Sequence, residues 1–302
     1  MKKYLFLILL SPVVAEFLSG SSPFFSFFNP FVLLVYIGFY GFGCLLVREV
    51  TSHKNLGYRS VLLLGAAFGI LEEGIILKSW FDPTWMGAQI TSKVLRVYGI
   101  SVLQPFANVA YHAVVSIAAP IMLIESKASR EPWLTERGIV CAGAVFVIAA
   151  FFLQTFNDYT IKGWQYLFAA LFLVLFIILG LKNKIPSTTR MYSPGKIWTL
   201  GFLFVFLLFF IFYGLSNMGA PWYIILGLAL FMYSVYWRMI SRCMWERINL
   251  FAAGAGIVTG LLPIVAIMAM ADPEKIGNFV GAVISALVLV TMYKNLRSES
   301  AV

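Results

Sequence analysis

The sequence predicts an all-α protein, a polytopic transmembrane helical bundle of about ten spans with both termini in the cytoplasm. Of its 302 residues, 61% are hydrophobic and only 12% are charged, whereas a soluble domain is about half apolar and a quarter charged. The apolar residues form runs long enough to cross a bilayer as helices, which takes about 20 residues. The basic residues are also divided unevenly between the segments that join these runs.

Ten apolar runs give the candidate helices, and short segments join them. The runs are residues 4–19, 30–47, 60–80, 103–124, 138–156, 164–181, 197–216, 221–238, 248–271 and 276–293. The longest connection, which follows the third run, is expected to carry a short interfacial helix. The N-terminus begins with two lysines and an apolar run, as a signal peptide does, and we expect it to be retained as the first span.

The 22 Lys and Arg residues indicate the orientation. With the N-terminus in the cytoplasm, outer segments hold only Lys93, Arg96, Lys162 and Lys275, Lys78 lies within a span, and the others fall in inner segments. Positive charge concentrates on the cytoplasmic side of membrane proteins, so we expect a multi-pass protein of the inner (plasma) membrane. This distribution accounts for the net charge of +9 without nucleic acid, and the lipid bilayer is the expected partner.

The chain is expected to form one integral membrane domain over residues 1–302, with two halves that differ in polarity. Residues 1–158 hold the ionisable groups that lie inside predicted spans, and residues 159–302 form an apolar supporting half. The three cysteines have no paired spacing, so no disulfide framework is expected. A functional site is therefore expected in the first half.

Helices 1, 3 and 4 place four ionisable groups at one depth. At about 1.5 Å per residue, Glu16, Glu72 and Glu73 lie about 18–20 Å above the inner surface. His112 lies about 14 Å below the outer surface by the same rise, and in a hydrocarbon core about 30 Å thick these depths coincide. Ionisable groups inside a membrane usually face a partner or a cavity, so we expect the four to share a site.

Helical spacing indicates where the acidic pair points. The GAAFG segment, residues 65–69, forms a small-residue face that lets a neighbouring backbone approach closely. Glu72 and Glu73 flank the continuation of this face, so both are expected to point into the protein. Lys78 is poorly spaced to pair with either acid, and it is expected to reach the outer surface or to meet Asp82.

The fourth helix carries a polar stripe, because Asn108, His112 and Ser116 are spaced by four residues. A histidine beside carboxylates can carry out proton chemistry. Glu16 and Ser116 are candidate substrate-binding residues within the membrane. Asp158, at the outer end of the fifth helix, is a candidate substrate-binding residue at the rim.

The four central candidates suggest a catalytic arrangement. Glu72 and Glu73 would serve as the base that activates water and its partner, while His112 and Asn108 would stabilise an oxyanion. Zinc sites usually have several His or Cys ligands, and one histidine among glutamates is an unusual set. The sequence therefore predicts no metal and no other cofactor.

A paired Glu-Glu on one membrane helix and a histidine on the next resemble the CPBP family, the CAAX-protease and bacteriocin-processing intramembrane proteases. That family has the motif EExxxR, then FxxxH, then a later histidine with Asn or Asp four residues on, and its glutamate activates water for peptide hydrolysis. Here Glu72 and Glu73 match the acidic pair, and Lys78 lies one position after the place of the arginine. His112 matches the second motif without its Phe, and no later histidine follows.

The chain also looks like prokaryotic multi-span membrane proteins with an EEG helix followed by FDP, a likeness that implies no activity. The leading hypothesis is a membrane-embedded hydrolase, protease-like by its resemblance, that acts on a membrane-embedded peptide or small-molecule substrate. The alternatives are a proton-coupled small-molecule transporter with Glu72 or Glu73 as the proton carrier, and a non-catalytic scaffold or immunity-type protein. Whether the protein is an enzyme stays open at this point.

Overall fold

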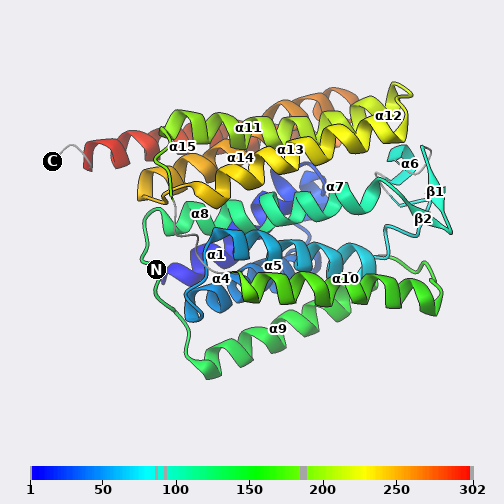
Figure 1. Ribbon diagram of the computed structural model, residues 1–302, viewed down its shortest axis with the longest axis horizontal. Helices are drawn as coiled ribbons and strands as arrows, with labels where there is room; N and C mark the ends of the chain where they lie inside the picture. Colours follow the sequence, from blue (N-terminus) through cyan, green and yellow to red (C-terminus); the bar gives the residue numbers. More distant parts are fainter. Residues whose placement is uncertain (1, 86–87, 92–93, 184–188, 300–302) are drawn as a thin grey trace.

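The computed structural model describes residues 2–85, 88–91, 94–183 and 189–299, most of which are helical (Figure 1). The chain first forms α1 (Lys3–Pro12), η1 (Val13–Phe17), α2 (Phe24–Phe27), α3 (Pro30–Tyr36), η2 (Ile37–Gly41), α4 (Phe42–His53), α5 (Tyr58–Ile70), η3 (Leu71–Ile76), α6 (Ala88–Thr91), α7 (Gln104–Tyr111), η4 (His112–Ala118) and α8 (Ala119–Glu125). It continues with α9 (Glu136–Gln154), α10 (Gly163–Lys182), α11 (Pro194–Phe209), η5 (Phe210–Gly214), α12 (Leu215–Asn217), α13 (Trp222–Arg242), α14 (Arg247–Ala271), η6 (Pro273–Lys275) and α15 (Ile276–Glu299). Segments η1 to η5 are π-helical and continue the helix before them, whereas η6 is a 3-10 turn.

Within the described residues, eight helices are long and apolar enough to cross a membrane, judged by length and composition. Two more long helices run beside them. The helix of α1 and η1 is too short for this criterion, and the helix of α5 and η3 carries Arg59, Glu72 and Glu73. The predicted all-α, multi-span bundle is confirmed, and a helix is present for each of the ten predicted runs.

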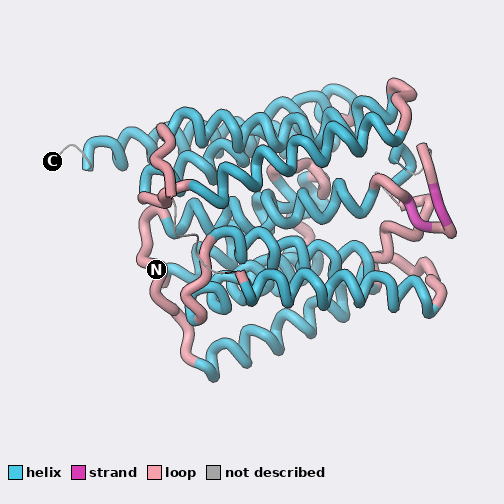
Figure 2. The backbone as a smooth tube through the Cα atoms, in the orientation of Figure 1, coloured by secondary structure: helices cyan, strands magenta, loops and turns pink. Residues whose placement is uncertain are grey.

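Both ends of the described chain lie at the same end of the bundle, which we call the terminal end (Figure 1). The opposite end, the hairpin end, carries strands β1 (Arg96–Val97) and β2 (Ile100–Ser101), the only strands in the described part of the chain (Figure 2). Tyr98 and Gly99 between them have φ values of 50° and 79°, as a two-residue type I′ turn requires. The predicted short helix of this connection is α6, whereas the hairpin was not predicted.

The helices form layers along the long axis of the molecule. Helices α11, α13, α14 and α15 lie on one side, and α9 and α10 lie on the other (Figure 1). Between them lie α1, α4, α5 and the continuous helix of α7, η4 and α8, which contacts α5 on one face and α14 on another. The layer that contains the predicted site is therefore covered on both sides. Two lysines used to predict the orientation, Lys93 of an outer segment and Lys184 of an inner segment, lie outside the described residues.

A buried ionic network closes the terminal end. The Arg48 guanidinium lies 2.5 Å from Glu49 Oε1 and 3.0 Å from Glu125 Oε1. It also stacks on Trp133 at 3.6 Å from the ring centre, and the Tyr58 hydroxyl donates to Glu125 at 2.5 Å. Buried charges are tolerated only when they are paired and hydrogen-bonded, so this network ties α4, α5 and α8 to the loop that precedes α9.

Candidate functional site

Glu72, Glu73 and His112 converge inside the bundle, as their shared depth predicts. His112 Nε2 lies 3.1 Å from Glu73 Oε1, and His112 Nδ1 lies 3.2 Å from Glu72 Oε2. Glu72 and His112 are almost completely buried, at 1% and 3% exposure. His112 thus contacts both carboxylates and is hydrogen-bonded to Glu73, so the three side chains form one chemical unit.

The small-residue face of α5 makes this convergence possible. A Cβ added to Gly69 would lie only 2.8 Å from His112 Cβ, and one added to Gly65 would lie 3.0 Å from Ala113 Cα. Helix α5 therefore contacts the backbone of η4 at Gly65 and the His112 side chain at Gly69. The predicted close approach at residues 65–69 is confirmed, and it brings the acids of η3 within reach of the histidine.

Tyr40 joins Glu16 to the cluster. Its hydroxyl lies 2.6 Å from Glu16 Oε1 and also contacts Glu72 Oε1 at hydrogen-bond distance. A tyrosine hydroxyl has one proton and can donate it to only one carboxylate. The second hydrogen bond therefore needs a proton on the other acid, with the hydroxyl oxygen as the acceptor. The unit of Glu16, Tyr40 and Glu72 thus shares protons among three groups from three different helices.

A second arm extends from Glu73 toward the hairpin end. Glu73 Oε2 accepts a hydrogen bond from the Ser79 hydroxyl. Asn108 Nδ2 donates to Ser79 Oγ at 3.3 Å, and Gln104 Nε2 donates to Asn108 Oδ1 at 3.3 Å. The fourth helix therefore presents polar groups to the cluster over several turns.

Ser116 completes the predicted polar stripe of Asn108, His112 and Ser116. Its hydroxyl lies 3.1 Å from His112 Nδ1, and all three side chains are buried. The spacing by four residues thus placed the three on one inward face. Because Ser116 contacts only the imidazole among the charged groups, its position suits holding the ring in place.

The four helices that build the cluster each do so from a π-helical segment. Glu16 lies in η1, Tyr40 in η2, Glu72 and Glu73 in η3, and His112 in η4. Such segments are rare in proteins and occur frequently at functional sites. Their convergence on one cluster distinguishes it from ordinary polar contacts between helices.

Two sequence predictions lie outside the cluster. Asp158 is exposed in the connection between α9 and α10 and, among the described residues, forms no hydrogen bond or ion pair with the cluster. Lys78 does not reach the surface, because it is only 5% exposed and its Nζ donates to the Asn157 carbonyl at 2.7 Å. With φ at 58°, Lys78 ends its helix and turns back into the protein. Asn157 Nδ2 in turn donates to Asp82 Oδ2 at 3.2 Å.

Tyr40 is the central residue that sequence reasoning missed. It lies in an apolar run that carries no ionisable group at this depth, so charge gave no signal. Depth alone could have found it, because Tyr40 is about ten residues into a helix that descends from Pro30, and so lies about 15 Å from the outer surface. Ser79 and Gln104 were missed because they lie at helix ends, where hydroxyl and amide side chains are common.

The cluster has the donor atoms of a small metal site. Glu72, Glu73 and His112 each offer one ligand atom, and these atoms lie within 4.8 Å of one another. Glu72 Oε2 is buried without a hydrogen-bond partner, since its contact with His112 lacks hydrogen-bond geometry. Two carboxylates and an imidazole suit a divalent cation such as Zn²⁺ or Mn²⁺. The predicted absence of a metal stays a prediction.

Comparison with known proteins adds a membrane assignment. A family model described as an uncharacterized membrane protein family matches residues 5–298. No curated protein and no solved structure matches the chain. The matching family is not the CPBP family, so the resemblance in the acidic pair stays a hypothesis.

Proposed function

The chain belongs to this uncharacterized membrane protein family, and from that premise we propose that it is a membrane-embedded hydrolase in which a glutamate activates water beside His112. The observation that supports the proposal most is the position of His112 between Glu72 and Glu73, at 3.2 Å and 3.1 Å. A base, a proton-transfer partner and nearby hydrogen-bond donors are the groups that hydrolysis of a carbonyl compound uses.

Glu73 is the better candidate for the base. Its side chain is 11% exposed, against 1% for that of Glu72, so a water molecule has easier access to it. In the proposed step, Glu73 takes a proton from water and the water oxygen bonds to the substrate carbonyl carbon. The bond from that carbon to the leaving group then breaks as His112 passes a proton to the leaving group, and the proton on Glu73 returns to His112. Asn108 Nδ2 uses one N–H on Ser79, which donates to Glu73, and its second N–H would donate to the developing oxyanion.

The other members would support this centre. Glu72 is fully buried and contacts both His112 and Tyr40, which suits a residue that orients the imidazole. The substrate would be a peptide or small molecule within the membrane, with Glu16 and Ser116 near its bound position. The inner membrane is the proposed location, because the terminal end gathers most of the basic residues.

One observation favours a second candidate, proton-coupled transport of a small molecule. Glu16, Tyr40 and Glu72 form a continuous hydrogen-bonded chain across three helices, and such chains of polar groups mark proton pathways in membrane proteins. A hydrolase and a transporter place different demands on Glu73, so its substitution separates them. A scaffold would use the cluster for packing alone.

The deciding experiment compares membranes that contain wild-type protein, Glu73→Gln or His112→Asn. New peptide termini in the membrane proteome are identified by mass spectrometry, and Glu274→Gln, an exposed acid of η6, serves as the control. A hydrolase gives cleavage products with wild type and Glu274→Gln and none with the two site variants. If no product depends on Glu73 but the variants abolish proton uptake in proteoliposomes, the transporter replaces the hydrolase as the proposed function. If the variants only lower thermal stability, the scaffold is the function that remains.

A further inference from the structure

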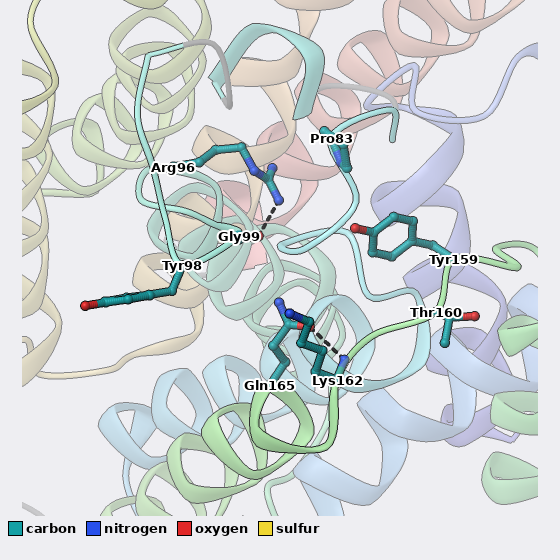
Figure 3. Close-up of a pocket in the computed structure, with 8 residues that line it drawn as sticks. All are labelled: Pro83, Arg96, Tyr98, Gly99, Tyr159, Thr160, Lys162 and Gln165. Carbon is teal, nitrogen blue, oxygen red and sulfur yellow. Dashed lines mark hydrogen bonds between the residues drawn. The ribbon is translucent and has the colours of Figure 1, made fainter.

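A second polar region lies at the hairpin end, away from the buried cluster. A hollow of about 350 Å³ opens there between the β1–β2 hairpin and the start of α10 (Figure 3). Its polar and aromatic lining consists of Arg96, Tyr98, Tyr159, Thr160, Lys162 and Gln165. This volume lies within the range of small-ligand sites, about 300–1,000 Å³.

The hairpin wall of the hollow presents a guanidinium that is held in place. Arg96 Nη2 donates to the carbonyls of Phe81 and Gly99, and the second of these bonds is drawn in Figure 3. Arg96 Nη1 is buried and has no hydrogen-bond partner. A buried donor without a partner costs free energy, and an anionic group that contacted Nη1 would remove this cost.

The opposite wall is the beginning of a long helix. Helix α10 starts directly after Lys162, which also lines the hollow, and the first N–H groups of a helix carry partial positive charge. The Lys162 backbone N–H donates to Gln165 Oε1 at 2.8 Å. A Cβ added to Gly99 would lie 3.4 Å from Gln165 Nε2, so the amide group faces the hairpin. Both walls thus offer donors.

The Asp82 charge acts on Arg96, but its carboxylate oxygens are hydrogen-bonded to other groups. Asp82 Oδ1 accepts from the backbone and hydroxyl of Thr84 at 2.8 and 2.7 Å, and Asp82 Oδ2 accepts from Asn157 Nδ2 at 3.2 Å. Among the described residues, neither Arg96 nor Lys162 forms an ion pair. Within the described part of the chain, both cations are therefore free of direct salt bridges and can contact an anion.

We propose that this hollow binds a phosphate ester, with Arg96 and Lys162 on the phosphate oxygens and the start of α10 behind them. Both N–H groups of Arg96 Nη2 are used by backbone carbonyls, so Nη1 would give the phosphate charge-assisted hydrogen bonds, and helix N-termini bind phosphate through the backbone. Tyr98 is 87% exposed and Trp164, beside the hollow, is 43% exposed, as aromatic residues at the level of lipid headgroups are. The same chemistry would be supplied by an anionic lipid or by a soluble phosphate ester.

The test measures binding of phosphatidylglycerol and of inorganic phosphate to the purified full-length protein by native mass spectrometry. Lys162→Gln removes one charge without breaking an ion pair, and Arg96→Lys keeps the charge but removes the Nη1 donor. Lys275→Gln in η6 is the matched control, since it removes a charge outside the hollow. We expect each hollow variant to weaken binding about tenfold, with the control unchanged.

The outcomes separate the two sources and leave the proposal open to refutation. Retention of phosphatidylglycerol over zwitterionic phosphatidylcholine, weakened in both hollow variants, identifies a lipid phosphate. Binding of inorganic phosphate with the same dependence, but without lipid preference, identifies a soluble phosphate ester. Equal binding by wild type, Lys162→Gln and Arg96→Lys, or no binding of either probe to wild type, overturns the proposal. None of these results depends on hydrolysis at Glu73.

Discussion

Gly69→Ala tests the geometry of the buried cluster with the smallest possible change. The new Cβ would lie 2.8 Å from His112 Cβ and 3.3 Å from His112 Cγ and Cδ2. Carbon atoms in favourable contact are about 3.5–4.0 Å apart, so the histidine and its backbone must recede by roughly 1 Å. The contact between His112 Nε2 and Glu73 Oε1, now 3.1 Å, would then exceed hydrogen-bond distance.

The two effects of this change on stability oppose each other. Overpacking of a close contact costs about 1–3 kcal/mol, while replacing glycine by alanine within a helix contributes about 0.5–1 kcal/mol. We expect a net loss of at most about 2.5 kcal/mol in the free energy of unfolding, by these two principles. Product formation should fall much further, about a hundredfold, because a displacement of about 1 Å at a catalytic group can cost that much.

Gly227→Ala is the matched control. Gly227 lies within α13, and a Cβ added there would have no atom within 4 Å, so this variant should gain about 0.5–1 kcal/mol. Both variants are compared with wild type by thermal unfolding in one detergent and by the formation of peptide termini in membranes. If Gly69→Ala keeps wild-type product formation, or stabilises the protein as much as Gly227→Ala does, the close contact of α5 with η4 is not what positions His112.

Three further predictions concern stability and orientation. Arg48→Met removes the nearest cation of two buried carboxylates, Glu49 and Glu125, and should cost about 3–5 kcal/mol, and an unchanged unfolding temperature would contradict this. Asn278→Ala removes two hydrogen bonds of 2.8 Å to backbone carbonyls and should cost about 1–3 kcal/mol. Substituting an exposed Asn by Ala should not produce this loss in the same unfolding measurement. In intact cells, a membrane-impermeant maleimide should label Tyr98→Cys and leave Cys141 unlabelled, and the reverse pattern would invert the predicted orientation.

The fold could be predicted because membrane insertion imposes a length and a composition on each helix. The ten runs and the even count of crossings follow from this constraint, and the depth of each group follows from the rise of a helix. Depth and spacing together placed Glu72, Glu73, His112 and Glu16 in one site. No structural detail beyond hydropathy and helical period was needed for these predictions.

The remaining features depend on the backbone, where sequence patterns carry little information. Tyr40 has no charge and lies among other aromatic residues, so nothing but depth distinguishes it. Lys78 turns inward because its backbone adopts a left-handed conformation, which non-glycine residues rarely do. The hairpin at residues 96–101 is too short for an alternating pattern to indicate it. No sequence pattern used here distinguishes a π-helical segment from an α-helix, so the detailed geometry of the site could not be predicted.

The π-helical turns also determine how the site responds to changes in chain length. A π-helical turn bonds each residue one position further along the chain than an α-helical turn does, and it is therefore equivalent to an α-helix with one inserted residue. Deleting a residue within η4 would therefore restore a regular helix and leave the two flanking segments in register, whereas a deletion in a regular helix rotates one flank by about 100° relative to the other. Only the residues of the turn itself would change direction, and His112 is the first of them. For engineers, a single-residue deletion in one of these four turns is thus a way to displace a cluster residue while the packing of the flanking helices persists.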